Sequence, residues 1–164
     1  MKIFVSGSAG QVGSHVVDEA LGRGDEVVGI DNFETGRPEH VAKNANYRFI
    51  QGSIGDTALV NQAFEEFRPD VVVHTAAAYK DPDDWLTDIE TNVRGMVNLV
   101  DASKRGGVGR FVYFQTALIY GVKPQENPVS LTHPRRVDNS SYSISKGAAE
   151  DYLVLSGIDY VTFR

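Results

Sequence analysis

The chain has 164 residues, of which 41% are hydrophobic and 23% charged, so it is long enough for one globular domain with a sizeable core. It contains no cysteine, which excludes disulfides and thiolate metal sites, and its net charge of −6 argues against nucleic acid and anionic membrane as partners. No apolar run is long enough to span a bilayer, and the residues before Gly7 are too few for a signal sequence, so we expect a cytoplasmic protein.

Short apolar runs alternate along the chain with longer amphipathic stretches. The runs predict strands at Ile3–Val5, Val27–Ile30, Tyr47–Ile50, Val71–His74, Phe111–Phe114 and Tyr160–Phe163. The stretches between them predict helices from Gly10 to Leu21 and over Asp56–Phe67, Asp84–Ser103 and Tyr142–Leu155. Most strands are apolar at consecutive residues, which is typical of parallel strands buried on both faces. The alternation therefore predicts an α/β fold with a doubly wound, Rossmann-like parallel sheet.

A glycine-rich turn follows the first predicted strand and opens the first helix. Gly7, Gly10 and Gly13 are spaced as Gly-x-x-Gly-x-x-Gly, with Gln11 and Val12 between the last two. Glycine lets a backbone turn tightly and approach a pyrophosphate, and the N–H groups at the start of a helix bind anions. Because strand-to-helix turns also use glycine for structural reasons, the turn alone does not establish a ligand.

An acidic residue follows the second predicted strand. Asp31 lies 18 residues after Gly13, where a carboxylate can accept the hydroxyls of an adenosine ribose and would repel a 2′-phosphate. The alternative is an acidic residue that only caps the end of the strand. Together with the glycine turn, Asp31 predicts NAD rather than NADP, while Arg37 six residues further on leaves NADP open.

A tyrosine and a lysine stand four residues apart at the start of the last predicted helix. Tyr142 and Lys146 therefore lie on one face of that helix. A free tyrosine, with a pKa of about 10, is a poor base near neutrality, but a neighbouring ammonium and a positively charged nicotinamide would lower that pKa. Thr116, at the end of the fifth predicted strand, offers a hydroxyl to the substrate oxygen from which Tyr142 would take a proton. Tyrosine and lysine at this spacing also occur on many helices that have only a structural role. The pair therefore indicates a catalytic site only together with the glycine turn.

Several further blocks resemble those of the extended short-chain dehydrogenase/reductases, in their branch of NAD-dependent nucleotide-sugar epimerases and dehydratases. The blocks are Asp31-Asn32-Phe33 with Gly36-Arg37, His74-Thr75-Ala76-Ala77, Asn92-Val93-x-Gly95-x-x-Asn98-Leu99 and Thr116-Ala117-Leu118-Ile119-Tyr120-Gly121. The resemblance runs from Lys2 to Arg164, and in the family this stretch is the cofactor-binding half. We therefore expect one NAD-binding domain over 1–164, truncated after its last strand and without the substrate-binding part.

The resemblance implies functional roles for residues along the whole chain. Tyr142, Lys146 and Thr116 would be catalytic, and no metal is expected. NAD would be bound by Gly7, Gly10, Gln11, Val12, Gly13, Asp31, Asn32, Phe33, Gly36, Ser53, Ile54, Ala76, Ala77, Ala78, Lys80, Asn92, Tyr142 and Lys146. Asn92 would also hold the active-site architecture through hydrogen bonds. Ser53 stands where the family commonly has an acid that binds the adenine amine, so that contact would be weaker or made differently.

The reaction that the resemblance implies is epimerisation of a nucleotide sugar, with C4 as the expected centre. Tyr142 would take a proton from a sugar hydroxyl while the sugar carbon gives a hydride to NAD. The keto sugar would then rotate and receive the hydride on its opposite face. Ala117 and Leu118 stand where dehydratases of this branch carry an Asp-Glu pair, which disfavours dehydration.

Two alternatives to the epimerase remain open. One is a reductase, dehydrogenase or dehydratase of the same family, and the other is a non-catalytic module that binds NAD. The resemblance also implies a homodimer, formed through the long helix and the helix of Tyr142 and Lys146. It names neither the sugar nor the nucleotide.

Other side chains with possible chemistry are interpreted as structural. His74 ends a predicted buried strand and is expected to be a packed, hydrogen-bonded core residue rather than a general base. Asp81, Asp83 and Asp84 precede an apolar helix, which favours a helix cap over a metal site. Trp85 is expected to be buried against the sheet rather than stacked on a base.

Overall fold

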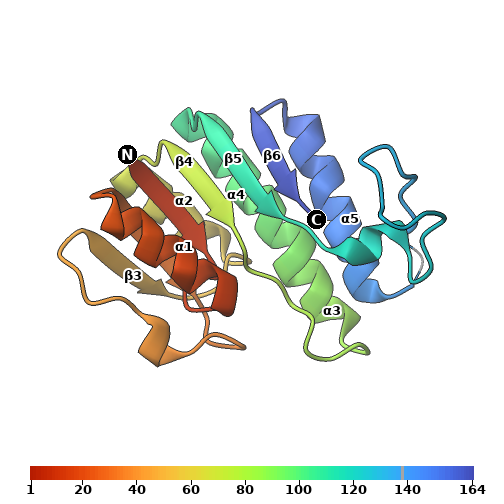
Figure 1. The fold of residues 1–164 in the computed structure, drawn as a ribbon. Coiled ribbons are helices and arrows are strands. Elements are labelled where there is room, and N and C mark those ends of the chain that lie inside the picture. Colours follow the sequence, from red (N-terminus) through yellow and green to blue (C-terminus); the bar gives the residue numbers. More distant parts are fainter. Residues whose placement is uncertain (138) are drawn as a thin grey trace.

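The computed structural model describes residues 1–137 and 139–164 and contains a six-stranded parallel sheet. Its strands are β1 (Lys2–Ser6), β2 (Glu26–Asp31), β3 (Tyr47–Gln51), β4 (Val71–His74), β5 (Arg110–Phe114) and β6 (Tyr160–Phe163). They lie in the order β3-β2-β1-β4-β5-β6 (Figure 1). This order confirms the predicted doubly wound, Rossmann-like fold, and each strand begins and ends within one residue of its prediction.

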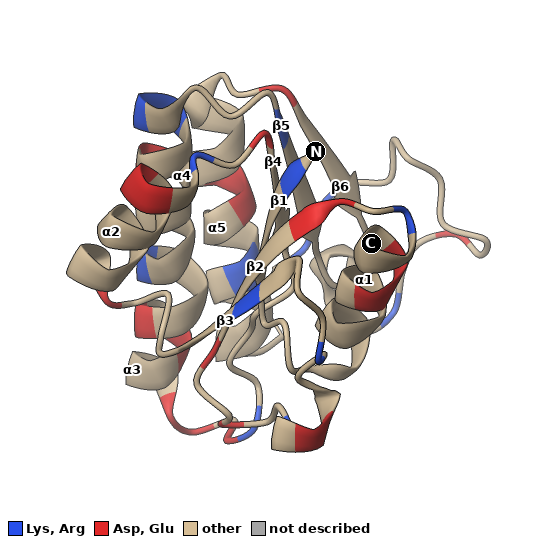
Figure 2. Ribbon diagram, turned by 90° about the vertical axis from the view of Figure 1, so that its left-hand side faces the viewer, with Lys and Arg blue, Asp and Glu red and all other residues tan. Residues whose placement is uncertain are grey.

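The helices cover the two faces of the sheet unequally. They are α1 (Gln11–Gly22), α2 (Thr57–Phe67), α3 (Trp85–Asp88), α4 (Gly95–Gly106) and α5 (Ser141–Ser156), with short 3₁₀ turns at Pro38–His40 and Ala117–Tyr120. Helix α1 packs on one face, whereas α2, α4 and α5 pack on the other (Figure 2). The larger core lies on the three-helix side, where Phe4, Leu99 and Leu153 are fully buried.

Local sequence signals set the ends of several helices. The Asp56 side chain accepts hydrogen bonds from the backbone N–H groups of Ala58 and Leu59, both at 3.0 Å, and so caps α2. Gly107 ends α4 with a φ of +69°, a conformation that costs glycine little. Asp84 caps α3 by accepting from Thr87 N at 3.1 Å, as the structural interpretation of the acidic cluster predicted.

The long helix predicted over Asp84–Ser103 is interrupted. Between α3 and α4 the backbone forms a π-helical turn at Ile89–Arg94, and Asn92 lies buried within it. Such turns are rare and occur mostly at functional sites. An apolar periodicity of 3.6 residues cannot reveal one extra residue in a single turn, which is why the sequence predicted one uninterrupted helix.

The prediction that Trp85 is buried against the sheet is wrong. The residue is 64% exposed, and its indole N–H donates to Pro82 O at 3.2 Å. Helix α3 lies beyond the carboxyl ends of the strands rather than on a face of the sheet (Figure 1), so its apolar side chains have no sheet residues to pack on. Within the described residues, no helix is both long and apolar enough to span a membrane.

Candidate active site

A cleft of about 1300 Å³ opens at the carboxyl ends of the strands. In a doubly wound sheet, ligands bind where the strand order reverses, and here the chain order reverses between β1 and β4. Twelve of the residues predicted to bind NAD line this cleft: Gly7, Gly10, Gln11, Val12, Gly13, Asp31, Asn32, Ser53, Ile54, Ala76, Ala77 and Ala78. The fold thus brings four separate segments of the chain to one place.

The glycine turn packs too closely for side chains. A Cβ at Gly7, whose φ is +74°, would lie 2.6 Å from Ala76 N, and one at Gly13 would lie 2.0 Å from Gly7 O. Gly10 precedes α1 and provides no side-chain cap. Because the first N–H groups of a helix have no acceptor within the helix, the start of α1 is suited to an anion such as a pyrophosphate.

Asp31 holds the loop after β2 and also lines the cleft. Its carboxylate accepts hydrogen bonds from Ala9 N at 3.0 Å and from Phe33 N at 2.8 Å. Phe33 has a φ of +61°, which is unusual for a bulky residue, and a Cβ at Gly36 would lie 2.6 Å from Asp31 Oδ1. Phe33 and Gly36 therefore lie against Asp31 and its loop rather than in the lining of the cleft. The capping role weighed for Asp31 is real, and it does not exclude a ligand.

Lys80 lies near the cleft without lining it. Its ammonium pairs with the Glu34 carboxylate at 3.4 Å, and both side chains are mostly exposed. Such exposed pairs contribute little to stability. Ser53, which does line the cleft, uses its hydroxyl to accept from Gly55 N at 3.1 Å.

Asn92 connects the loop after β4 to helix α5. Its side chain accepts from Ala78 N at 2.8 Å and donates to Ala78 O at 3.0 Å. The same amide donates to Ser145 Oγ at 3.0 Å, one residue before Lys146. Asn92 is 1% exposed, so its amide is withdrawn from solvent and fully used. It does not line the cleft, but it fixes two segments that flank it.

Tyr142, Lys146 and Thr116 come together beside the cleft. The Lys146 ammonium donates to Phe114 O at 2.7 Å and lies 4.2 Å from the centre of the Tyr113 ring. Burial lowers the pKa of Lys146 to about 7, and the charge of Glu150 opposes this shift. Burial raises the pKa of Tyr142, while a hydrogen bond with Thr116 opposes that shift.

Burial, and not the charge of Lys146, is the largest effect on the pKa of Tyr142 in this structure. The lysine ammonium is bound to a strand carbonyl, and burial, which disfavours the phenolate, is the largest effect on Tyr142. A positive charge brought into the cleft is therefore needed if Tyr142 is to act as a base near neutral pH.

His74 is a buried core residue, as predicted. It forms a hydrogen bond between Nδ1 and Ser6 Oγ at 2.7 Å and stacks on Tyr113 with ring centres 5.3 Å apart. Burial, and then the positive charge of Lys146, hold its pKa well below the ordinary value. The imidazole is therefore neutral and enclosed between β1, β4 and β5.

Three residues near the site were not singled out by the sequence. Tyr79 lines the cleft and meets Tyr142 edge to face, with ring centres 6.2 Å apart. Gln115 and Glu150 join the end of β5 to α5 through partly buried hydrogen bonds. Glu150 follows Lys146 by one helical turn on the inward side of α5, and a carboxylate at that spacing was the signal that could have revealed it.

The fold and the site together define the class of protein: a doubly wound α/β protein with its site at the reversal of strand order. The chain belongs to the NAD dependent epimerase/dehydratase family, whose model matches residues 3–164. This confirms the family predicted from the sequence blocks. It also confirms NAD as the predicted cofactor at the level of the family.

Known proteins similar to this chain include enzymes of nucleotide-sugar metabolism. The structure of the Bordetella bronchiseptica enzyme WbmH in complex with NAD⁺ is 61% identical, with a TM-score of 0.97 over 99% of this chain and 55% of that one. UDP-glucose 4-epimerase of Lacticaseibacillus casei is 36% identical over 100% of this chain and 50% of its own length. UDP-glucuronic acid decarboxylase 1 of Arabidopsis thaliana is 38% identical over 92% of this chain and 35% of its own length. The chain thus spans about half the length of these proteins, or less.

The buried His74 predicts a pH dependence of stability. Because its folded pKa lies below its ordinary value of 6.5, the unfolded chain binds more protons as the pH falls below 6.5, and stability is lost in that direction. Urea unfolding at about pH 7.5 and about pH 5.5 should show that wild type loses about 1.4 kcal/mol more than His74→Asn between the two values. Equal losses in the two proteins would mean that His74 titrates normally in the folded state.

Proposed function

We propose that the full-length protein containing this chain is an NAD-dependent nucleotide-sugar epimerase, acting at C4 of a UDP-sugar in the cytoplasm. The observation that carries this proposal is a cleft lined by the glycine turn and Asp31, whose lining residue Tyr79 meets Tyr142 of the Tyr142–Lys146 pair edge to face. The similarity to a UDP-glucose 4-epimerase along the whole chain supports the same reaction. Ala117 and Leu118, in place of an acidic pair, argue against dehydration.

The residues of the cleft are suited to NAD. The uncapped start of α1 would hold the pyrophosphate, and glycine at positions 7 and 13 lets the turn pack closely against Ala76 and itself at that helix start. Asp31 would accept the hydroxyls of the adenosine ribose through the oxygen lone pairs that Ala9 and Phe33 do not use. Its negative charge favours NAD over NADP.

The chemistry of the proposal follows from three side chains. NAD, when bound, supplies the hydride-accepting carbon and the positive charge of its oxidised nicotinamide. Tyr142 takes the proton from the sugar hydroxyl and later returns it. Thr116, which hydrogen-bonds Tyr142 in this structure, would also hydrogen-bond the oxygen of that sugar hydroxyl. Lys146 stabilises the phenolate by its charge when it is protonated.

Two further points belong to the proposal. The similarity to a UDP-glucuronic acid decarboxylase makes decarboxylation of a UDP-uronic acid the second candidate reaction, and release of carbon dioxide would distinguish it. A homodimer is proposed through α4 and α5, which pack side by side and expose Val97, Ile144 and Tyr152.

Replacement of Asp31 by alanine should weaken NAD binding and reduce the preference for NAD over NADP. The lost ribose contacts should cost about 1–3 kcal/mol, since each is a hydrogen bond to a charged group. Titration calorimetry with each cofactor measures both effects. Glu26→Ala is the control because it removes an exposed carboxylate at the opposite end of β2, away from the cleft. Equal NAD affinity in wild type and Asp31→Ala would refute the assignment.

Replacement of Tyr142 by phenylalanine should abolish most turnover while leaving the fold and NAD affinity intact, because only a hydroxyl is lost. Loss of a general acid–base group costs about 10² to 10⁴ in rate. Lys146→Met should also lower the turnover rate severely, whereas Thr116→Val should lower it less because the base, Tyr142, remains. Rates of the full-length proteins with a UDP-hexose, measured across the pH range, provide the test. Turnover of Tyr142→Phe within about threefold of wild type at every pH would rule out this mechanism.

A further inference from the structure

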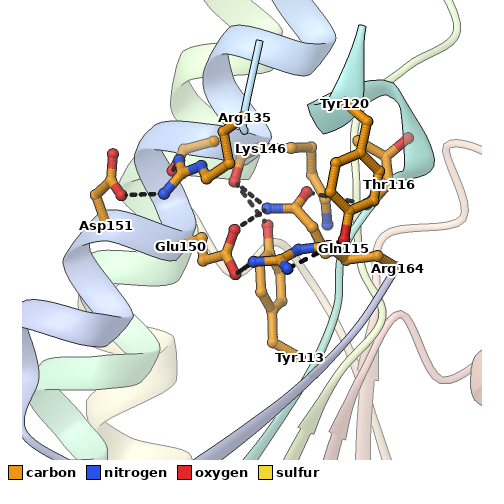
Figure 3. A network of polar contacts seen from close by, with 10 residues as sticks. Tyr113, Gln115, Thr116, Tyr120, Arg135, Lys146, Glu150, Asp151 and Arg164 are labelled. Carbon is orange, nitrogen blue, oxygen red and sulfur yellow. Dashed lines mark hydrogen bonds and ion pairs between the residues drawn. The ribbon is translucent and has the colours of Figure 1, made fainter. Parts of the chain in front are cut away.

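A buried carboxylate lies one helical turn beyond Lys146. Glu150 is 2% exposed, and each of its oxygens has a partner: Oε2 accepts from Gln115 Nε2 at 3.0 Å, and Oε1 accepts from Arg164 at 2.5 Å (Figure 3). Arg164 also donates to the Tyr120 hydroxyl at 3.3 Å. The carboxylate therefore joins α5 to the ends of two strands, β5 and β6.

Gln115 extends this connection to two proposed catalytic residues. Its Nε2 donates to Lys146 O at 2.9 Å as well as to Glu150, and its Oε1 accepts from Thr116 N at 2.9 Å. Its backbone N–H donates to Phe163 O at 2.7 Å. One side chain thus sets the position of the Thr116 backbone relative to Lys146 (Figure 3).

Stability alone is a weak explanation for this arrangement. Transfer of a carboxylate and a guanidinium out of water costs several kcal/mol, and apolar replacements of buried ion pairs are often neutral or stabilising. The negative member of the pair lies on the same helix as Lys146, one turn further along. This placement points to a role in the site.

We infer that Glu150 and Gln115 are positioning residues for the proposed epimerase site: Gln115 fixes Thr116 against α5, and the buried Glu150 carboxylate, one helical turn from Lys146, favours the protonated form of that lysine. Only the expected effect on the catalytic rate rests on the proposed function. The charge effect itself is a property of this chain and can be measured without a substrate.

The charged and titratable groups around Lys146 give the sign of the effect. His74 on β4 is neutral, and Tyr113 on β5 has a pKa raised by burial, so neither supplies a negative charge near neutral pH. Glu150 on α5 raises the pKa of Lys146 against the larger effect of burial. Arg164 pairs with the same carboxylate at 2.5 Å, and its positive charge would be left unpaired if Glu150 were neutralised. Loss of the Glu150 charge must therefore lower the pKa of Lys146.

The groups around Tyr142 act on the other member of the pair. Tyr79, after β4, and Asp88, on α3, both disfavour the phenolate, and Thr116 favours it. Glu150 acts on this phenol through Lys146, because a neutral lysine no longer stabilises the phenolate. Removal of the Glu150 charge should therefore reduce the active form of the pair most strongly on the alkaline side.

The first experiment is an NMR titration of the Lys146 side chain in this chain, assigned with Lys146→Arg. In Glu150→Gln, the Lys146 pKa should fall by roughly one unit relative to wild type. Asp151→Asn is the matched control, since it removes the same charge from the next residue, where Asp151 pairs with Arg135 at the surface. Equal Lys146 titrations in Glu150→Gln and Asp151→Asn would overturn the inference.

The second experiment measures pH–rate profiles of the full-length protein. Glu150→Gln should move the alkaline limb of kcat to lower pH, whereas Gln115→Ala should lower kcat without moving that limb or the KM for the sugar. An unchanged pH–rate profile in Glu150→Gln would overturn the role of Glu150 in the charge of Lys146, and an unchanged kcat in Gln115→Ala would overturn the positioning role of Gln115.

If Glu150→Gln does not fold, Gln115→Ala still decides the positioning role of Gln115. An inactive wild type would refute the proposed function, and the NMR titration would still decide the charge effect.

Discussion

The parallel pairing of all six strands is the constraint on which the rest of the structure depends. Because every neighbouring pair is parallel, all carboxyl ends lie at one edge, and the reversal of order between β1 and β4 separates the loops that follow them. The glycine turn, the loop of Asp31 and the segment after β4 meet at that opening. A site assembled from distant segments thus follows from topology before any side chain is considered.

Buried hydrogen bonds give that site its fixed geometry. Asn92 binds the Ala78 backbone and Ser145, and Gln115 binds Lys146 and Thr116. The Asn92 bonds and the Gln115–Lys146 bond join residues 14 to 53 positions apart, whereas Gln115 and Thr116 are neighbours in the chain. The π-helical turn contributes to this geometry because it contains the buried Asn92. Burial lowers the pKa of Lys146, and the buried Glu150 carboxylate opposes that shift.

The sequence predicted the sheet and the cleft well because strand burial and glycine spacing are local signals. Apolar runs located every strand, and Asp56 and Gly107 marked helix ends through their own backbone chemistry. Local sequence patterns could not predict the long-range contacts. Trp85 is exposed because α3 extends past the sheet, and Lys146 binds a strand carbonyl rather than its helical neighbour Tyr142. Both outcomes depend on where elements meet in space, which periodicity does not encode.

The proposed reaction takes place in this cleft and regenerates the cofactor within each turnover. The most direct test incubates the full-length protein, with NAD bound, with a UDP-hexose. NMR follows the configuration at C4 while absorbance follows the reduced nicotinamide. The account predicts the C4 epimer as product, with no accumulation of reduced cofactor. Reduced cofactor formed in step with an oxidised product would contradict the epimerase and identify a dehydrogenase.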